Sequence, residues 1–212
     1  MTLQFTTIIK NNVKLIITTI PDDINAKMNE YVEKNLPSIQ EKWENTVINR
    51  ILGTQPNMNA GIYSSSFFDN STFDKLSKDA TIIIFKAYEL LTTAGFNVKP
   101  NEGLINIDIF NIDTTTPIDT NYVVSCDNLI SNNNYESCIF YIRKDEYVKG
   151  DLEIYLEPPS YFLPSVFGMG KYMTLPTKSN LAILRSGNLY YKMQPHIGFG
   201  KEYIISVHLA KL

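Results

Sequence analysis

The sequence predicts an α+β fold in which N-terminal helices pack on an antiparallel β-structure of about eight strands. Two observations lead to this prediction. Helical periodicity is confined to the first hundred residues, whereas after Pro100 nearly every apolar segment is short, β-like and bounded by turn residues. The number and shortness of these segments favour a closed or double-sheet arrangement such as a jelly roll, also called a double-stranded β-helix.

The N-terminal part opens with a predicted β-hairpin over residues 3–20, which is rich in Thr and Ile. Asp22 and Asp23 then supply carboxylates that can cap a helix. A helical period continues to residue 51 but is interrupted at Pro37, so we expect either two helices or one kinked helix.

Residues 53–71 are rich in Gly, Asn, Pro and Ser and are therefore expected to form a loop. This loop carries three aromatic side chains, Tyr63, Phe67 and Phe68. Either these aromatics pin the loop to the body of the protein, or they form a surface that a partner binds.

The clearest helix covers residues 72–94, because its apolar side chains form one continuous stripe and Gly95 is placed to end it. The β-structure follows it. The predicted strands are 104–110, 122–126, 137–143, 151–156, 172–175, 180–185, 189–193 and 202–209.

Composition indicates one globular domain, with 44% hydrophobic and 19% charged residues among 212. Residues 1–100 would form the hairpin and helical support, and residues 101–212 the jelly-roll barrel. The net charge of -3 and the lack of a Lys/Arg run predict no nucleic-acid binding, and no apolar run is long enough to cross a bilayer. We expect an intracellular location, in the cytoplasm or in a virion, with Cys126 and Cys138 as thiols, although a cross-strand disulfide stays open.

Three passages resemble the 2-oxoglutarate- and Fe(II)-dependent oxygenases, especially the prolyl 4-hydroxylase-like branch. Residues 104–127 resemble the entry strand, turn and metal-binding strand of that family, and residues 138–156 resemble a strand, an acidic turn and the start of the next strand. Residues 180–209 resemble the strand of the second metal ligand, a Gly-rich turn and the strand that carries the cosubstrate-binding cation. The resemblance covers residues 72–212 and implies a double-stranded β-helix.

The resemblance also implies an Fe(II) site made of two His and one carboxylate, which this sequence does not preserve. The family's His-x-Asp motif is Ser125-Cys126-Asp127 here, and Tyr191 stands at the second His position. Ser125, Asp127 and Tyr191 are thus candidate positions of a degenerate metal site, and we expect no catalytic residue, metal or cofactor. The chain has only two His, so a rebuilt site would have to recruit His196 and His208.

Lys201 falls where the resemblance places the cation that binds the cosubstrate carboxylate. Together with the hydroxyl of Tyr141 or Tyr191 it could hold a small acid. Alternatively, Lys201 is a solvated side chain paired with Glu202. If the alignment shifts by one residue, Glu202 takes this position instead.

The leading hypothesis is a catalytically inactive oxygenase-like protein, a pseudoenzyme that serves as a binding or structural module with a protein partner or with further copies of itself. The richness in Ile, Asn and Lys is typical of an AT-rich genome, which suits a viral protein or a protist protein. The alternative is an active dioxygenase of the prolyl hydroxylase type, which would use Fe(II) and 2-oxoglutarate with unusual ligands. A fold alone does not decide between them.

Overall fold

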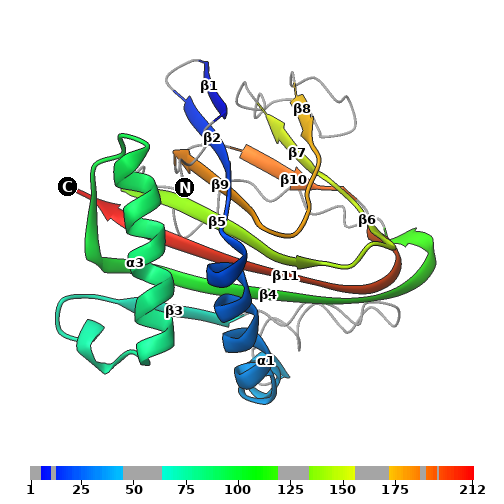
Figure 1. Ribbon diagram of the computed structural model, residues 1–212, viewed down its shortest axis with the longest axis horizontal. Coiled ribbons are helices and arrows are strands. Elements are labelled where there is room, and N and C mark those ends of the chain that lie inside the picture. The colour runs from blue at the N-terminus through cyan, green and yellow to red at the C-terminus, as the bar shows by residue number, and fades with distance from the viewer. Residues whose placement is uncertain are drawn as a thin grey trace, which may run out of the picture.

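A computed structural model describes residues 6–10, 13–44, 64–118, 134–155, 172–186, 190–194 and 196–212 of the 212-residue chain. Within these residues the protein has two α-helices and eleven β-strands (Figure 1). The helices are α1 (Asp22–Glu44) and α3 (Lys78–Thr93), with a short 3-10 helix, η1 (Phe73–Lys75), between them. The strands are β1 (Thr6–Lys10), β2 (Val13–Thr19), β3 (Ser64–Phe68), β4 (Val98–Ile118), β5 (Tyr135–Lys144), β6 (Val148–Lys149), β7 (Leu152–Tyr155), β8 (Tyr172–Leu175), β9 (Leu181–Ser186), β10 (Tyr190–Met193) and β11 (His196–Lys211).

The strands form two antiparallel sheets. The larger sheet has the order β1-β2-β9-β5-β11-β4-β3, with β6 also paired to β11, and the smaller sheet has the order β10-β7-β8. The N-terminal hairpin joins the larger sheet because β2 pairs with β9. The predicted antiparallel, β-rich fold with helices in the N-terminal half is therefore confirmed.

The larger sheet has two buried faces. On one face, which we call the helix face, side chains such as Ile84 of α3, Val32 of α1 and Ile205 of β11 share one apolar core. On the other, which we call the inner face, Ile204 of β11 packs with Ile154 of the smaller sheet. Figure 1 shows both helices lying across the same face of the larger sheet. Because side chains alternate along a strand, adjacent residues of β11 belong to different cores.

Local signals set the bounds of α3. The Ser77 hydroxyl accepts a hydrogen bond from the Ala80 amide at 3.1 Å, which satisfies one free N–H of the first turn. At the other end Gly95 has φ +78°, and its amide donates to the Thr92 carbonyl at 2.9 Å. Gly95 thus ends the helix as predicted, whereas the helix begins at Lys78 and not at residue 72, because Ser77 caps it there. Neither α1 nor α3 is long and apolar enough for a membrane-spanning helix, and no other α-helix is described.

Helix α1 runs without a break from Asp22 to Glu44, so of the two alternatives expected at Pro37 the structure has one helix and not two. One prediction about the N-terminal half was wrong. Residues 64–68, expected to lie in a loop, form strand β3, which pairs with β4. Pairing with a long neighbouring strand outweighed the weak strand propensity of Ser. The predicted strand 122–126 lies outside the described residues.

The packing of α3 on the sheet predicts a large difference between two isoleucines of that helix. Ile84 is fully buried, whereas Ile82 is 42% exposed. We expect Ile84→Ala to lower the free energy of unfolding by about 2–5 kcal/mol, because it removes buried methyl groups and leaves a cavity. Ile82→Ala, the matched control, should cost well under half of that. Urea denaturation of both variants measures the difference, and equal losses would contradict the assignment of this helix face.

Candidate functional site

A β-bulge in β5 decides which side chains reach each face of the larger sheet. Arg143 pairs with Tyr203 of β11, whereas the next pair along β11 joins Ile204 to Tyr141. Ile142 is therefore an extra residue on β5. An extra residue reverses the alternation of side chains that follow it.

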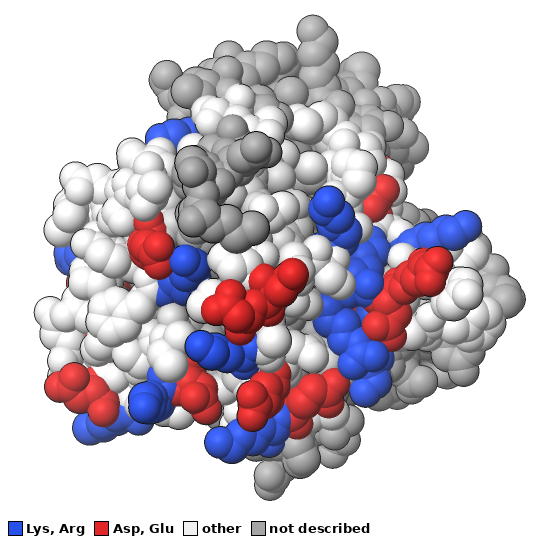
Figure 2. Space-filling view, viewed as in Figure 1, with Lys and Arg blue, Asp and Glu red and all other residues white. Residues whose placement is uncertain are grey.

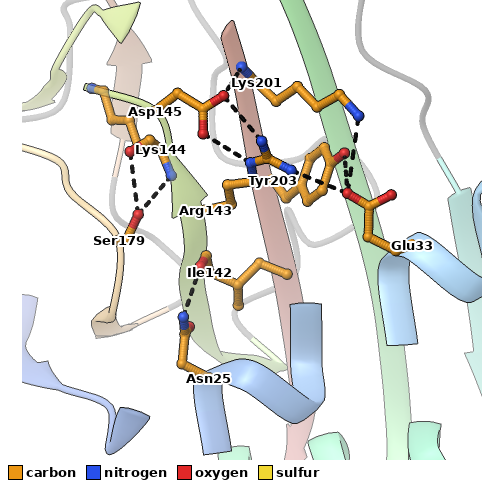
Figure 3. Close-up of polar contacts among 9 residues, drawn as sticks. All are labelled: Asn25, Glu33, Ile142, Arg143, Lys144, Asp145, Ser179, Lys201 and Tyr203. Atoms are coloured by element: carbon orange, nitrogen blue, oxygen red, sulfur yellow. Dashed lines mark hydrogen bonds and ion pairs between the residues drawn. The ribbon is translucent and has the colours of Figure 1, made fainter. Parts of the chain in front are cut away.

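The bulge is supported from both sides. The Asn25 side chain of α1 donates from Nδ2 to the carbonyl of Ile142 at 2.8 Å, and the Lys144 amide donates to Ser179 Oγ at 2.7 Å (Figure 3). After the bulge, Arg143 lies on the helix face and Lys144 enters the inner side, where it pairs with Glu202 of β11.

On the helix face, five charged or hydroxyl side chains form one cluster, which ties α1 to β5 and β11 (Figure 3). Glu33 Oε1 accepts from the Tyr203 hydroxyl at 2.8 Å and from Arg143 Nη1 at 3.1 Å, and it lies 4.0 Å from Lys201 Nζ. Asp145 accepts from Arg143 Nε at 2.8 Å, and this hydrogen bond lowers the pKa of Asp145. Acidic and basic groups are mixed over this side of the molecule (Figure 2). The cluster balances its own charges and offers no surplus charge for a ligand.

On the inner face, β11 contributes a buried acid, Glu202, with no exposed side-chain surface. Its Oε2 atom is hydrogen-bonded to His196 Nε2, and its Oε1 atom lies 3.8 Å from the ammonium of Lys144. The His196 ring stacks on Phe110 of β4, with centroids 5.2 Å apart. The side chains of His196 and Lys144 are also buried, with exposed fractions of 5% and 6%. A buried carboxylate of this kind requires such partners, because an isolated charge is costly to bury.

Further along β11, the inner face carries His208, which is 1% exposed. Its Nδ1 atom lies 2.7 Å from Ser137 Oγ of β5, and its Nε2 atom lies 3.4 Å from Asn106 Nδ2 of β4. Burial, and then the charge of nearby Arg185, lower the pKa of His208 to about 3. His208 is therefore a neutral, hydrogen-bonded part of the sheet at physiological pH.

An Fe(II) site of the family type requires two His nitrogens and one carboxylate that are free to coordinate the metal. Among the described residues, no three His, Cys, Asp or Glu side chains are grouped so that they could hold a metal ion. Both nitrogens of His208 are engaged by β4 and β5 neighbours, and His196 is engaged by Glu202. The two histidines and their described surroundings do not fit the iron site, and we derive no reaction step through it.

The structure describes one of the three candidate metal-site positions, Tyr191. Ser125 and Asp127 lie outside the described residues. Tyr191 is in β10, in the smaller sheet, where it pairs with Ile154 of β7. Their role stays a prediction from the resemblance.

The structure does not bring together the two candidate acid-binding residues. Lys201 extends on the helix face toward Glu33, whereas Tyr141 is buried in the core between the two sheets. The inner position next to Lys201 on β11 is held by Glu202, which is the alternative that a one-residue shift of the alignment gives.

The candidate partner surface is corrected at one position. Phe68 is fully buried and packs in the core under α3, so it cannot be part of an exposed aromatic patch. The physical reason is that β3 pairs with β4 and so brings Phe68 under the helix layer. Phe67 lies in the same strand, and Tyr63 is outside the described residues.

Of the two cysteines, Cys138 is a buried free thiol, and burial raises its pKa well above the ordinary value. This makes Cys138 a poor nucleophile. Cys126 lies outside the described residues.

Sequence reasoning missed Lys144 and the partners of the two histidines. Strict alternation along β11 was a usable signal for Glu202, because Tyr203 and Ile205 continue an apolar face that Glu202 does not share. No such signal was available for Lys144, since its orientation depends on the bulge at Ile142.

The fold is that of the 2-oxoglutarate and Fe(II)-dependent oxygenases. The chain superposes on a prolyl-4-hydroxylase from Pseudomonas putida with a TM-score of 0.54 and 6% identity, covering 93% of this chain and 92% of that one. It also superposes on SnoK, a non-heme alpha ketoglutarate dependent carbocyclase from nogalamycin biosynthesis (TM-score 0.53, 8% identity, 92% and 79% covered).

A third similar structure is HygX from Streptomyces hygroscopicus with nickel, 2-oxoglutarate and hygromycin B bound (TM-score 0.52, 8% identity, 93% and 82% covered). No family model and no curated protein sequence matches the chain. The resemblance inferred from the sequence is thus confirmed as a shared fold, and fold does not carry activity with it.

The buried His208 predicts a pH dependence of stability. Its pKa is about 3 in the folded protein against an ordinary value of 6.5, so between these two values only the unfolded chain binds the proton. The free energy of unfolding should therefore fall as the pH is lowered through this window, by up to about 1.4 kcal/mol per pH unit. His208→Gln removes this contribution. The free energy of unfolding of this variant, measured in urea, should therefore fall less steeply than that of the wild type as the pH is lowered from 6.5 to about 3.

The control for this experiment is Lys75→Met, because Lys75 is exposed and a lysine keeps its charge throughout the window. This variant should retain the wild-type slope. Equal slopes for the wild type and His208→Gln would contradict the assignment of a neutral, buried His208.

Proposed function

We propose that this protein has kept the oxygenase fold without 2-oxoglutarate and iron chemistry, and serves as a binding or structural module. The observation that carries the proposal is the state of its only two histidines. Both lie on β11, and each is buried and already hydrogen-bonded to neighbouring side chains.

His208 supports the proposal most strongly. To coordinate a metal it would have to give up Ser137 or Asn106, and either partner would then be left buried without its hydrogen bond. Its backbone is also paired on both sides, with Leu104 of β4 and with Ser137 of β5, so the residue cannot move to a new position without breaking the sheet. At most His196 remains for a metal, and an iron site of the family type needs two His.

The charges on β11 support the same proposal. The inner position carries the acidic Glu202, which His196 and Lys144 already partner, so the Lys144 ammonium is not free to bind an incoming dicarboxylate. Lys201, the cation expected to attract such an acid, extends to the opposite face of the sheet. We therefore propose that the inner face works as a polar part of the core.

The test is anaerobic binding of Fe(II) and 2-oxoglutarate, followed by exposure to air. We expect calorimetry and metal analysis to find no stoichiometric Fe(II) on the wild type, and no succinate to form. One equivalent of Fe(II) together with succinate production would overturn the proposal in favour of an active dioxygenase with unusual ligands.

A gain-of-function variant serves as the positive control. Ser125→His combined with Tyr191→His restores the two His that the sequence resemblance calls for, beside the existing Asp127. We expect this double variant to bind Fe(II) more tightly than the wild type by at least about tenfold. Metal uptake by the variant alone would show that the assay detects a complete site and that the wild type lacks one.

A further inference from the structure

The Lys144 ammonium lies in an enclosure of oxygen atoms where the two sheets meet. It donates hydrogen bonds to the Gly150 carbonyl and to Thr177 Oγ1. Two carboxylate oxygens complete the surroundings, Asp151 Oδ1 at 3.7 Å and Glu202 Oε1 at 3.8 Å. We call these four oxygens the oxygen cage. They comprise a carbonyl, a hydroxyl and two carboxylates, which are the donors that hard cations prefer.

The oxygen cage is held in place by contacts of its own. The Thr177 amide donates to Asp151 Oδ1 at 3.0 Å, and the Thr177 hydroxyl lies 3.2 Å from the Gly150 carbonyl. The Asp151 carbonyl accepts from the Gln194 amide at 2.8 Å. Three of the four oxygens are therefore positioned independently of the lysine, as a pre-organised site requires.

Glu202 supplies an independent sign that a cation belongs here. Its side chain has no exposed surface, and Oε1 has no hydrogen-bond donor among the described residues. The Lys144 ammonium at 3.8 Å is the cation that this oxygen faces. Removing that ammonium would leave a buried carboxylate oxygen without compensation, which is among the costliest changes in a protein interior.

We propose that the oxygen cage is an internal cation site which the Lys144 ammonium fills, and that it binds a free ammonium ion when this side chain is shortened. In the intact protein the tethered cation links β5 and β11 of the larger sheet to the residues that adjoin β7 and β8 of the smaller one. This inference does not depend on whether the protein has lost iron chemistry.

The test is chemical rescue of Lys144→Ala. We expect this variant to unfold at a lower temperature than the wild type, and ammonium chloride to recover about half or more of the loss by mass action. Tetramethylammonium chloride at the same ionic strength should not recover the lost melting temperature, because the tetramethylammonium ion is too large for the cage and lacks N–H donors. Lys201→Ala, which removes an ammonium that is 39% exposed, is the matched control and should show no ammonium-specific recovery. Equal effects of the two salts on Lys144→Ala would overturn the proposal.

If Lys144→Ala does not fold, a double-mutant cycle keeps the proposal testable. Lys144→Met preserves most of the apolar stem, and Glu202→Gln removes the charge that the ammonium balances. We expect Glu202→Gln to destabilise the wild type but to raise the melting temperature of Lys144→Met. If Glu202→Gln has the same effect in both backgrounds, the two groups are not coupled and the proposal fails.

Discussion

The two-residue alternation of strand β11 is the constraint on which the rest of this structure depends. This strand pairs with β4 along one side and with β5 and β6 along the other, so it cannot rotate or slip without breaking both sets of pairs. The side chains of neighbouring β11 residues therefore lie on opposite faces of the larger sheet. Lys201 reaches the helix layer, whereas Glu202 reaches the inner face, and this one-residue difference separates a surface cation from a buried acid.

The bulge at Ile142 adapts β5 to that constraint. By reversing the alternation it places Arg143 beside Tyr203 and aligns Lys144 with Glu202. A buried ion pair adds little net stability over apolar packing, but loss of one partner is costly. The Lys144–Glu202 arrangement therefore requires both side chains to be present together. The hydrogen bond from Asn25 of α1 to the Ile142 carbonyl connects the helix layer to the bulge that aligns them.

The shared fold of this protein and the polar groups described on its inner sheet face are two separate observations. Its backbone follows that of 2-oxoglutarate-dependent oxygenases over more than nine-tenths of the chain at 6–8% identity. On the inner face of the larger sheet, however, the described polar groups bind one another: His208 is engaged by Ser137 and Asn106, and Glu202 by His196. Apolar alternation and strand pairing require only the right pattern, whereas an iron site requires particular side chains at particular places, so a shared fold does not establish a shared site.

The sequence by itself determined the strand-rich second half, the long helix ended by Gly95, and the scarcity of His that argues against an iron site of the family type. These follow from periodicity, turn chemistry and composition, which are local properties. Only the tertiary structure decided that residues 64–68 form a strand, that Phe68 is buried and that Lys144 faces Glu202. Those outcomes depend on which strands become neighbours and on one extra residue in a ladder, and neither is encoded in a short stretch of sequence.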